Sequence, residues 1–172
     1  MMNRLNIKRF VIYLIFFVII QIPMLQNWVF YGTAFPFQYI GFILLLPHDW
    51  NRNSAMLIGF FLGLLMDVFS NTPGMHAMAT VFLAYARPFW LEVMTDTADE
   101  DLDLSISHLG YGRFLVMILP VVFVHHFILF ALENEGFGLI WNLLGKVFWS
   151  SILSTVIIFM VGMLTMTKKR RE

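Results

Sequence analysis

Long apolar stretches alternate with short polar breaks along most of this chain. A helix of about 20 apolar residues crosses the hydrocarbon core of a bilayer. The breaks hold turn formers and charged residues, such as the run Asn-Thr-Pro-Gly at 71–74, which favour water over hydrocarbon. The pattern predicts an all-α, polytopic membrane protein with one transmembrane domain over residues 1–172. Its six predicted spans are residues 10–24, 33–46, 54–70, 75–92, 112–132 and 139–167.

Composition supports the membrane class and excludes several functions. Apolar residues make up 59% of the chain and charged residues 13%, too few to cover the surface of a soluble domain. The formal net charge is zero and there is no basic stripe outside the two ends of the chain, which argues against nucleic acid as a partner. Cysteine is absent, so disulfides, thiolate metal sites and thiol catalysis are excluded. We expect no metal and no cofactor.

The distribution of basic residues predicts the orientation. With six spans and a cytoplasmic N-terminus, both termini are cytoplasmic, and of the eleven Lys and Arg residues only Lys146 lies away from the cytoplasmic side. The second stretch is short and contains Pro36. If it only re-entered the membrane, five spans would remain and the basic tail 168–171 would face outside, so the charges favour six. The acidic cytoplasmic loop 93–111 is interpreted as a solvated loop or as a docking surface for a basic partner.

The third predicted span carries small and acidic residues at helical spacing. Gly59, Gly63 and Asp67 recur every four residues and share one face, with Ser70 beside them. Small residues let a second helix approach closely in lipid, and a carboxylate inside a span should face protein or water. This face is therefore either a helix-packing surface or a pocket or partner seam.

The fourth predicted span offers a matching semi-polar stripe. His76, Thr80, Ala84 and Arg87 recur at helical spacing, and the short turn before them makes the two spans antiparallel neighbours. An ion pair of Asp67 with His76, or with Lys146 of the sixth span, would offset the burial of the carboxylate. Both pairings are hypotheses.

Other polar residues in the spans give weak signals for chemistry. His125 and His126 are adjacent, so only one of them can face a shared site. A metal site of Asp67, His76 and one of these histidines lacks any ligand-spacing motif. Serines of the sixth span are expected to help helices pack, and no nucleophile-elbow or phosphate-loop pattern occurs. We therefore expect no enzymatic activity. The serines of the sixth span that are expected to help helices pack are Ser150, Ser151 and Ser154.

The segment from Gly59 to Tyr85 resembles the signature of the rod shape-determining protein MreD family. That family shows a Gly-x-x-x-Gly-x-x-x-Asp run, a short turn ending in glycine, and a histidine followed by small residues and an aromatic. The rest of the chain agrees with the family in hydropathy alone, and the acidic loop is not part of its pattern. The matching positions are Gly59, Gly63, Asp67, Ser70, Gly74, His76, Ala77 and Tyr85.

The resemblance implies a non-enzymatic scaffold in the bacterial cytoplasmic (inner) membrane, required for rod shape and lateral peptidoglycan synthesis. Such a protein binds the single-span protein MreC and links the MreB filament to wall synthases of the RodA and penicillin-binding types. Its fold is similar to that of the substrate-binding components of energy-coupling-factor transporters. The main alternative is such a small-molecule-binding transporter component, although the first span lacks the small-residue face that those components present.

Overall fold

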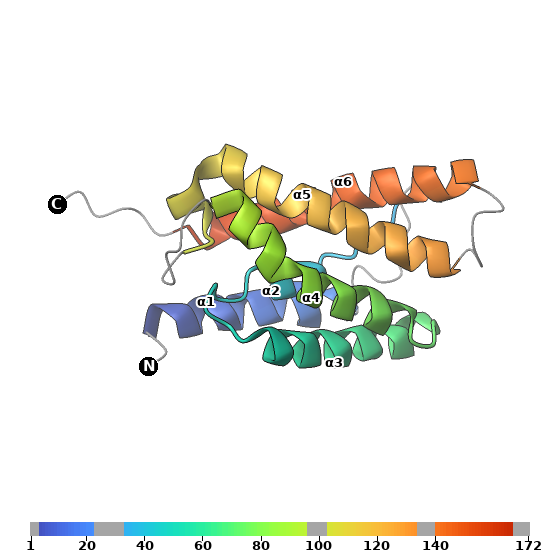
Figure 1. The fold of residues 1–172 in the computed structure, drawn as a ribbon, viewed down its shortest axis with the longest axis horizontal. Coiled ribbons are helices and arrows are strands. Elements are labelled where there is room, and N and C mark those ends of the chain that lie inside the picture. Colours follow the sequence, from blue (N-terminus) through green and yellow to red (C-terminus); the bar gives the residue numbers. More distant parts are fainter. Residues whose placement is uncertain (1–3, 23–32, 96–102, 134–139, 167–172) are drawn as a thin grey trace.

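The computed structural model describes residues 4–22, 33–95, 103–133 and 140–166. These residues fold into helices joined by turns and one irregular segment (Figure 1). The first turn of α1 and the last turn of α6 lie at the same end of the bundle. The helices are α1 (Arg4–Leu14), the π-helix η1 (Ile15–Ile19), α2 (Ile40–Leu44), α3 (Arg52–Ser70), α4 (Met75–Thr95), α5 (Ile106–Glu133) and α6 (Ile140–Leu164).

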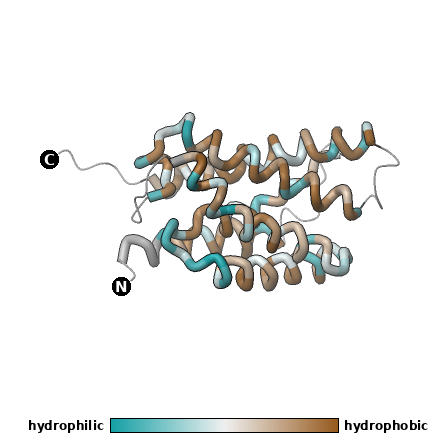
Figure 2. Tube along the Cα trace, in the orientation of Figure 1, coloured by the Kyte–Doolittle hydropathy of each residue, from teal (hydrophilic) through white to brown (hydrophobic). Residues whose placement is uncertain are grey.

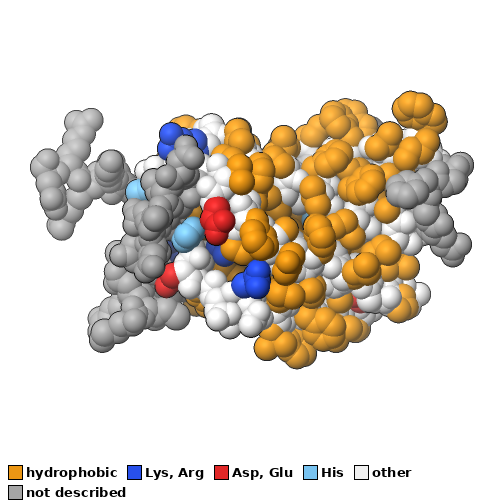
Figure 3. All heavy atoms as spheres, viewed as in Figure 1, with side chains coloured by type: hydrophobic (Ala, Val, Ile, Leu, Met, Phe, Trp, Pro, Cys, Tyr) orange, Lys and Arg blue, Asp and Glu red, His pale blue; other side chains and the backbone are white. Residues whose placement is uncertain are grey.

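The outer surface of the bundle is apolar along most of its length. Within the described residues, three helices are long and apolar enough to cross a membrane, namely α3, α5 and α6. Large apolar side chains are exposed on them and on α4, including Val68, Trp141 and Leu164. Figure 2 shows polar residues gathered toward the ends of the helices, and Figure 3 shows apolar side chains covering the middle of the visible face. The protein is therefore a helical, membrane-embedded chain.

Helices α3 and α4 form an antiparallel hairpin at the positions predicted from the sequence. The side chain of Asn51 accepts a hydrogen bond from the backbone N–H of Asn53 and so caps the start of α3. Asn71 ends α3 in a left-handed conformation with φ 55°, which asparagine tolerates better than most residues. A turn with Gly74 at φ 80° then leads into α4.

The second predicted span differs from the structure. No spanning helix forms over residues 33–46; residues 33–39 are irregular, and the chain then makes only the five-residue helix α2. We call residues 33–51 the central segment. Its residues 36–46 are buried inside the bundle, and Tyr39, Ile40 and Leu44 are fully buried. The apolar composition of the stretch therefore reflects burial among the other helices rather than a lipid-facing helix.

The start of α5 is tied to α1 by an ion pair. Gly110 has φ 78° and interrupts the helical geometry between the first turn of α5 and its long apolar part. Just before α5, the Asp103 carboxylate accepts two hydrogen bonds from the Arg9 guanidinium, at 2.7 and 2.8 Å. Of the predicted acidic loop, Asp103 thus pairs within the chain, whereas residues 96–102 lie outside the described residues.

This ion pair predicts a small loss of stability in acid. Burial alone would raise the pKa of the Asp103 carboxyl, but the hydrogen bonds and charge of Arg9 outweigh it and hold the pKa below 3.8. Because the pKa of this carboxyl is lower in the folded than in the unfolded state, the ionised carboxylate stabilises the fold above pH 3.8. This contribution disappears as pH falls through the folded-state pKa. Because the pair is partly exposed, we expect less than about 1 kcal/mol. Thermal unfolding in detergent at pH 7 and pH 3 should show a smaller decrease for Asp103→Asn than for the unaltered chain; an equal decrease would contradict the assignment.

Candidate functional site

A cluster of polar side chains lies at the centre of the bundle around Tyr39. The Tyr39 hydroxyl is 3.0 Å from His76 Nδ1, 3.1 Å from Thr80 Oγ1 and 3.0 Å from His125 Nε2. All four residues are almost completely buried. They come from the central segment, α4 and α5, so we call them the Tyr39 cluster. It joins three parts of the chain that are distant in sequence.

The hydrogen-bond partners restrict the protonation pattern of this cluster. The Thr80 hydroxyl donates to the backbone carbonyl of His76 at 2.7 Å, so Thr80 can only accept from the cluster. His125 Nδ1 is buried and has no hydrogen-bond partner. An unpaired buried N–H group costs more free energy than an unpaired ring lone pair, because the N–H is a strong donor that has lost its hydrogen bonds to water. We therefore assign the proton of His125 to Nε2, from which it is donated to the Tyr39 oxygen.

Serines of α6 bind the backbone of the central segment. Ser150 Oγ accepts from the Phe35 N–H at 2.9 Å, and Ser154 Oγ accepts from the Phe37 N–H at 3.0 Å. Ser154 also lies 3.3 Å from His126 Nε2, while His126 Nδ1 lies 2.8 Å from the Val122 carbonyl. With both His126 nitrogens engaged, His126 donates from Nδ1 and accepts the Ser154 proton at Nε2. His125 and His126 thus face different partners.

Gln21 binds the backbone of the central segment at two positions. Its Nε2 donates to the Pro36 carbonyl at 2.9 Å, and its Oε1 accepts from the Tyr39 N–H at 3.2 Å. The Gln21 side chain is completely buried. One amide therefore satisfies a backbone acceptor and a backbone donor that the irregular conformation leaves free.

Arg87 binds the other end of the central segment. Its guanidinium donates to the backbone carbonyls of Leu44, Leu46 and Pro47, which follow one another where α2 ends. Arg87 is 2% exposed, although it belongs to a predicted span. The last carbonyls of a helix have no intrahelical donor, and a guanidinium with five N–H groups can serve several of them at once.

These contacts share one physical cause. Inside a bilayer no water is available, so irregular backbone is tolerated only where protein groups satisfy it. Polar residues that interrupt the apolar stretches supply those groups, namely Gln21, Arg87, Ser150 and Ser154, whereas His76, Thr80 and His125 bind the Tyr39 hydroxyl. The arrangement is suited to holding the central segment in place. Of the three serines predicted to help helices pack, Ser150 and Ser154 bind the backbone of this segment, whereas Ser151 Oγ is buried without a hydrogen-bond partner.

Gln21 and Gln38 permit a matched test of this interpretation. Both side chains are fully buried, but neither amide atom of Gln38 has a hydrogen-bond partner. Gln21→Met should lower the free energy of unfolding by about 2 kcal/mol, because it strands a buried N–H and a buried carbonyl. Gln38→Met should raise it by about 1 kcal/mol, because it removes two unsatisfied groups at similar volume. Thermal unfolding in the same detergent measures both, and shifts of the same sign would contradict the assignment.

Asp67 stabilises the start of α4 from the end of α3. Its Oδ1 accepts from the His76 N–H at 2.9 Å and from the Thr72 hydroxyl at 3.0 Å, and its Oδ2 accepts from the Ala77 N–H at 3.0 Å. These backbone N–H groups belong to the first turn of α4, which has no intrahelical acceptor for them and carries the positive end of the helix dipole. The carboxylate therefore works as a cap supplied by the neighbouring helix.

Both proposed ion pairs of Asp67 are wrong. Asp67 binds the backbone of His76, whereas the His76 ring faces Tyr39. Lys146 Nζ lies 3.7 Å from Glu133 Oε1 and over the rings of Phe35 and Phe130, so its partners are at the α5–α6 end. Backbone amides satisfy the carboxylate so well that no cationic side chain is required.

Replacing Asp67 with asparagine should weaken the α3–α4 hairpin. One of the two acceptor oxygens becomes an NH2 group, which faces a backbone N–H and cannot accept from it. We expect the free energy of unfolding to fall by about 2 kcal/mol, as a lower melting temperature in detergent. Thr72→Val is the matched control, because it removes one donor to Asp67 and leaves the helix amides paired; it should cost less. Equal effects would mean that the helix amides are not the important partners.

The glycine face of α3 is covered by α4. A Cβ at Gly63 would lie 2.4 Å from Ala77 Cα, and one at Gly59 would lie 3.2 Å from the Thr80 carbonyl oxygen. The face therefore packs against a helix of the same chain and is not open to a partner. The structure does not bring every signature residue to this face: Tyr85 is exposed on α4, and Gly74 lies in the turn. Ser70 is the last residue of α3.

No group of three or more His, Cys, Asp or Glu residues in the described part of the chain is arranged to hold a metal ion. Asp67 is engaged with backbone amides, so it is not a third ligand beside His76 and His125. Sequence reasoning missed the two residues that organise the centre, Tyr39 and Gln21. The available signal was a run of polar and proline residues inside apolar stretches, because such residues are unusual in a lipid-facing helix.

Comparison with known proteins gives no assignment. No family model, no curated protein and no solved structure matches this chain.

Proposed function

We propose that this chain is a non-enzymatic membrane scaffold of the bacterial cell-elongation machinery, located in the inner membrane. The observation that carries the proposal is the segment from Gly59 to Tyr85, with its family-like spacing. Three of its residues have a clear structural reason for that spacing: Gly63 permits close packing, Asp67 caps α4, and His76 binds the centre. Signature residues that stabilise the fold are consistent with a scaffold function.

The proposed topology has six crossings with both termini in the cytoplasm. Helices α1, α3 and α5 run in one direction in Figure 1, α4 and α6 run in the other, and the central segment leads from the far end back to the start of α3. The second crossing would then be made by irregular backbone and α2, shielded from lipid. Ten of eleven basic residues would face the cytoplasm.

The centre of the bundle supports a scaffold over a small-molecule carrier. The central segment fills it with its own side chains, among them Tyr39, Ile43 and Leu44, which are completely buried. A carrier needs a cavity at this position, with polar groups turned toward its ligand. Here the polar groups of the Tyr39 cluster and Arg87 are turned toward the chain itself.

As a scaffold, the protein would bind MreC and connect MreB to wall synthases of the RodA and penicillin-binding types. Because the glycine face is internal, these partners would contact the outer surface or the cytoplasmic end. Exposed apolar residues of α3 and α4 are the candidate surface for the single span of MreC. They include Phe61, Val68, Met78 and Phe82.

Depletion of the protein in a rod-shaped host tests the proposal. We expect cells to become round and MreC to be captured by the tagged protein after crosslinking. The control is restoration of shape by the full chain expressed from a second locus. Cells that keep their shape and instead lose uptake of a vitamin would overturn the scaffold and favour the transporter component.

A further inference from the structure

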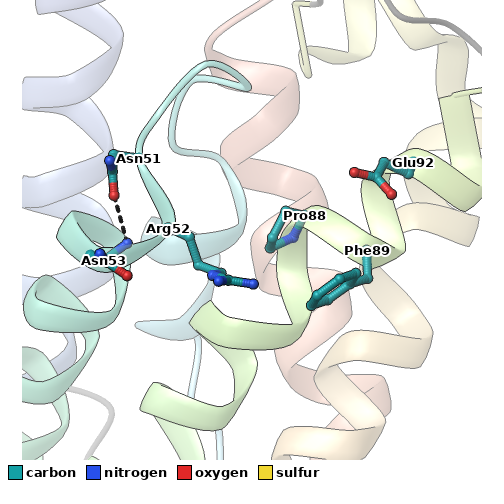
Figure 4. Close-up of a pocket in the computed structure, with 6 residues that line it drawn as sticks. All are labelled: Asn51, Arg52, Asn53, Pro88, Phe89 and Glu92. Atoms are coloured by element: carbon teal, nitrogen blue, oxygen red, sulfur yellow. Dashed lines mark hydrogen bonds between the residues drawn. The ribbon is translucent and has the colours of Figure 1, made fainter.

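A pocket of about 380 Å³ lies between the start of α3 and the end of α4 (Figure 4). Pro88, which lies inside α4, forms part of its wall. The pocket is independent of the Tyr39 cluster, which is buried deeper in the bundle. It is lined by Asn51, Arg52, Asn53, Pro88, Phe89 and Glu92.

The pocket contains one cation and one anion that do not neutralise each other. Arg52 and Glu92 are both exposed and line the same pocket, and although both are in the described part of the chain, no ion pair joins them. Figure 4 shows the Arg52 side chain turned toward Pro88 and Phe89, and Glu92 one turn further along α4. The two charges can therefore engage opposite charges of a single ligand.

Aromatic rings hold the Arg52 guanidinium at the edge of the apolar surface. It lies 5.1 Å from the ring centroid of Tyr85 and 5.8 Å from that of Phe89. Both rings are about half exposed, and exposed apolar residues continue from them along α3 and α4, including Leu57 and Phe60. Aromatic and basic side chains at this position are typical of the headgroup level of a membrane.

We propose that this pocket binds the headgroup of a zwitterionic phospholipid of the phosphatidylethanolamine type. The phosphate lies toward Arg52 and Asn53, the ammonium lies toward Glu92, and the acyl chains follow the apolar surface of α3 and α4. An anionic lipid would satisfy Arg52 but would meet the Glu92 carboxylate, which repels it. The proposal requires only that the protein is membrane-embedded, so it stands apart from the scaffold function.

Native mass spectrometry of the purified full chain, delipidated and titrated with defined lipids, tests this site. We expect phosphatidylethanolamine to be retained roughly tenfold better than phosphatidylglycerol, which corresponds to about 1.4 kcal/mol. Glu92→Gln should remove the preference by strengthening retention of the anionic lipid. Arg52→Gln should weaken retention of both lipids, because it removes the phosphate contact.

Arg113→Gln is the matched control, since Arg113 is an exposed arginine of α5 outside the pocket. It should leave retention unchanged, and circular dichroism should show equal helix content for all variants. An unchanged lipid preference in Glu92→Gln, or an equal loss in Arg113→Gln, would overturn the proposal. So would displacement of the lipid by soluble phosphoethanolamine at the same concentration, because the pocket would then recognise a soluble phosphate compound.

Discussion

Replacing Arg87 with methionine is expected to lower the free energy of unfolding by about 3 kcal/mol. The guanidinium donates to the carbonyls of Leu44, Leu46 and Pro47 at the end of α2, where a helix has no donors of its own for its last carbonyls. Methionine fills a similar volume but leaves the buried carbonyls of Leu44 and Leu46 without this donor, whereas the Pro47 carbonyl keeps the Trp50 N–H at 3.3 Å. The central segment should loosen first, because Arg87 is its contact at this end.

The measurement is thermal unfolding in detergent together with proteolysis of the central segment. Arg113→Met is the control, because it removes the same charge from an exposed position. Arg87→Lys should be intermediate, since an ammonium carries a positive charge but lacks the fork of donors that reaches three carbonyls. If Arg87→Met were as stable as Arg113→Met, the carbonyls would have other partners and the role assigned to Arg87 would be wrong.

Replacing Gly63 with alanine is the second substitution with a large expected effect. The added methyl would lie 2.4 Å from Ala77 Cα, 2.6 Å from Ala77 N and 2.6 Å from the His76 carbonyl oxygen. All three are backbone atoms, which no side-chain rotation can move away. Helices α3 and α4 must therefore separate, which also pulls Asp67 from the amides that it caps. We expect a loss of about 3 kcal/mol, at the upper end of the usual cost of overpacking.

Gly145→Ala provides the matched control for this substitution. Gly145 also lies within a long helix, but a Cβ there would meet nothing within 4 Å. Alanine has the higher helix propensity, so Gly145→Ala should be neutral or slightly stabilising. The melting temperature in detergent and the amount of protein in the membrane should both be lower for Gly63→Ala than for Gly145→Ala. Equal behaviour would mean that α3 and α4 are not packed as closely as the structure shows.

The effect of Gly63→Ala also bears on how in vivo phenotypes are interpreted. The glycine face was hypothesised as a partner seam, but it is occupied by α4. Loss of a partner in such a variant would therefore follow from loss of the fold. Substitutions on the exposed face of α3 and α4, such as Phe61 or Phe82, leave this packing intact and test partner binding directly.

Hydropathy and spacing alone determined the helical membrane class, the positions of α3, α4, α5 and α6, and the common face of Gly59, Gly63 and Asp67. These properties are local: an apolar stretch needs no knowledge of its neighbours to favour a helix in lipid, and residues four apart share a face in any helix.

Only the tertiary structure decided that residues 33–51 form a central segment that is irregular apart from α2, and that Asp67 caps α4. An apolar stretch buried inside a bundle has the same hydropathy as one facing lipid. Its backbone can leave the helix only if distant groups replace the lost hydrogen bonds, and those groups come from Gln21, Arg87, Ser150 and Ser154. Such compensation depends on which helices meet in space, which the pattern along the chain does not record.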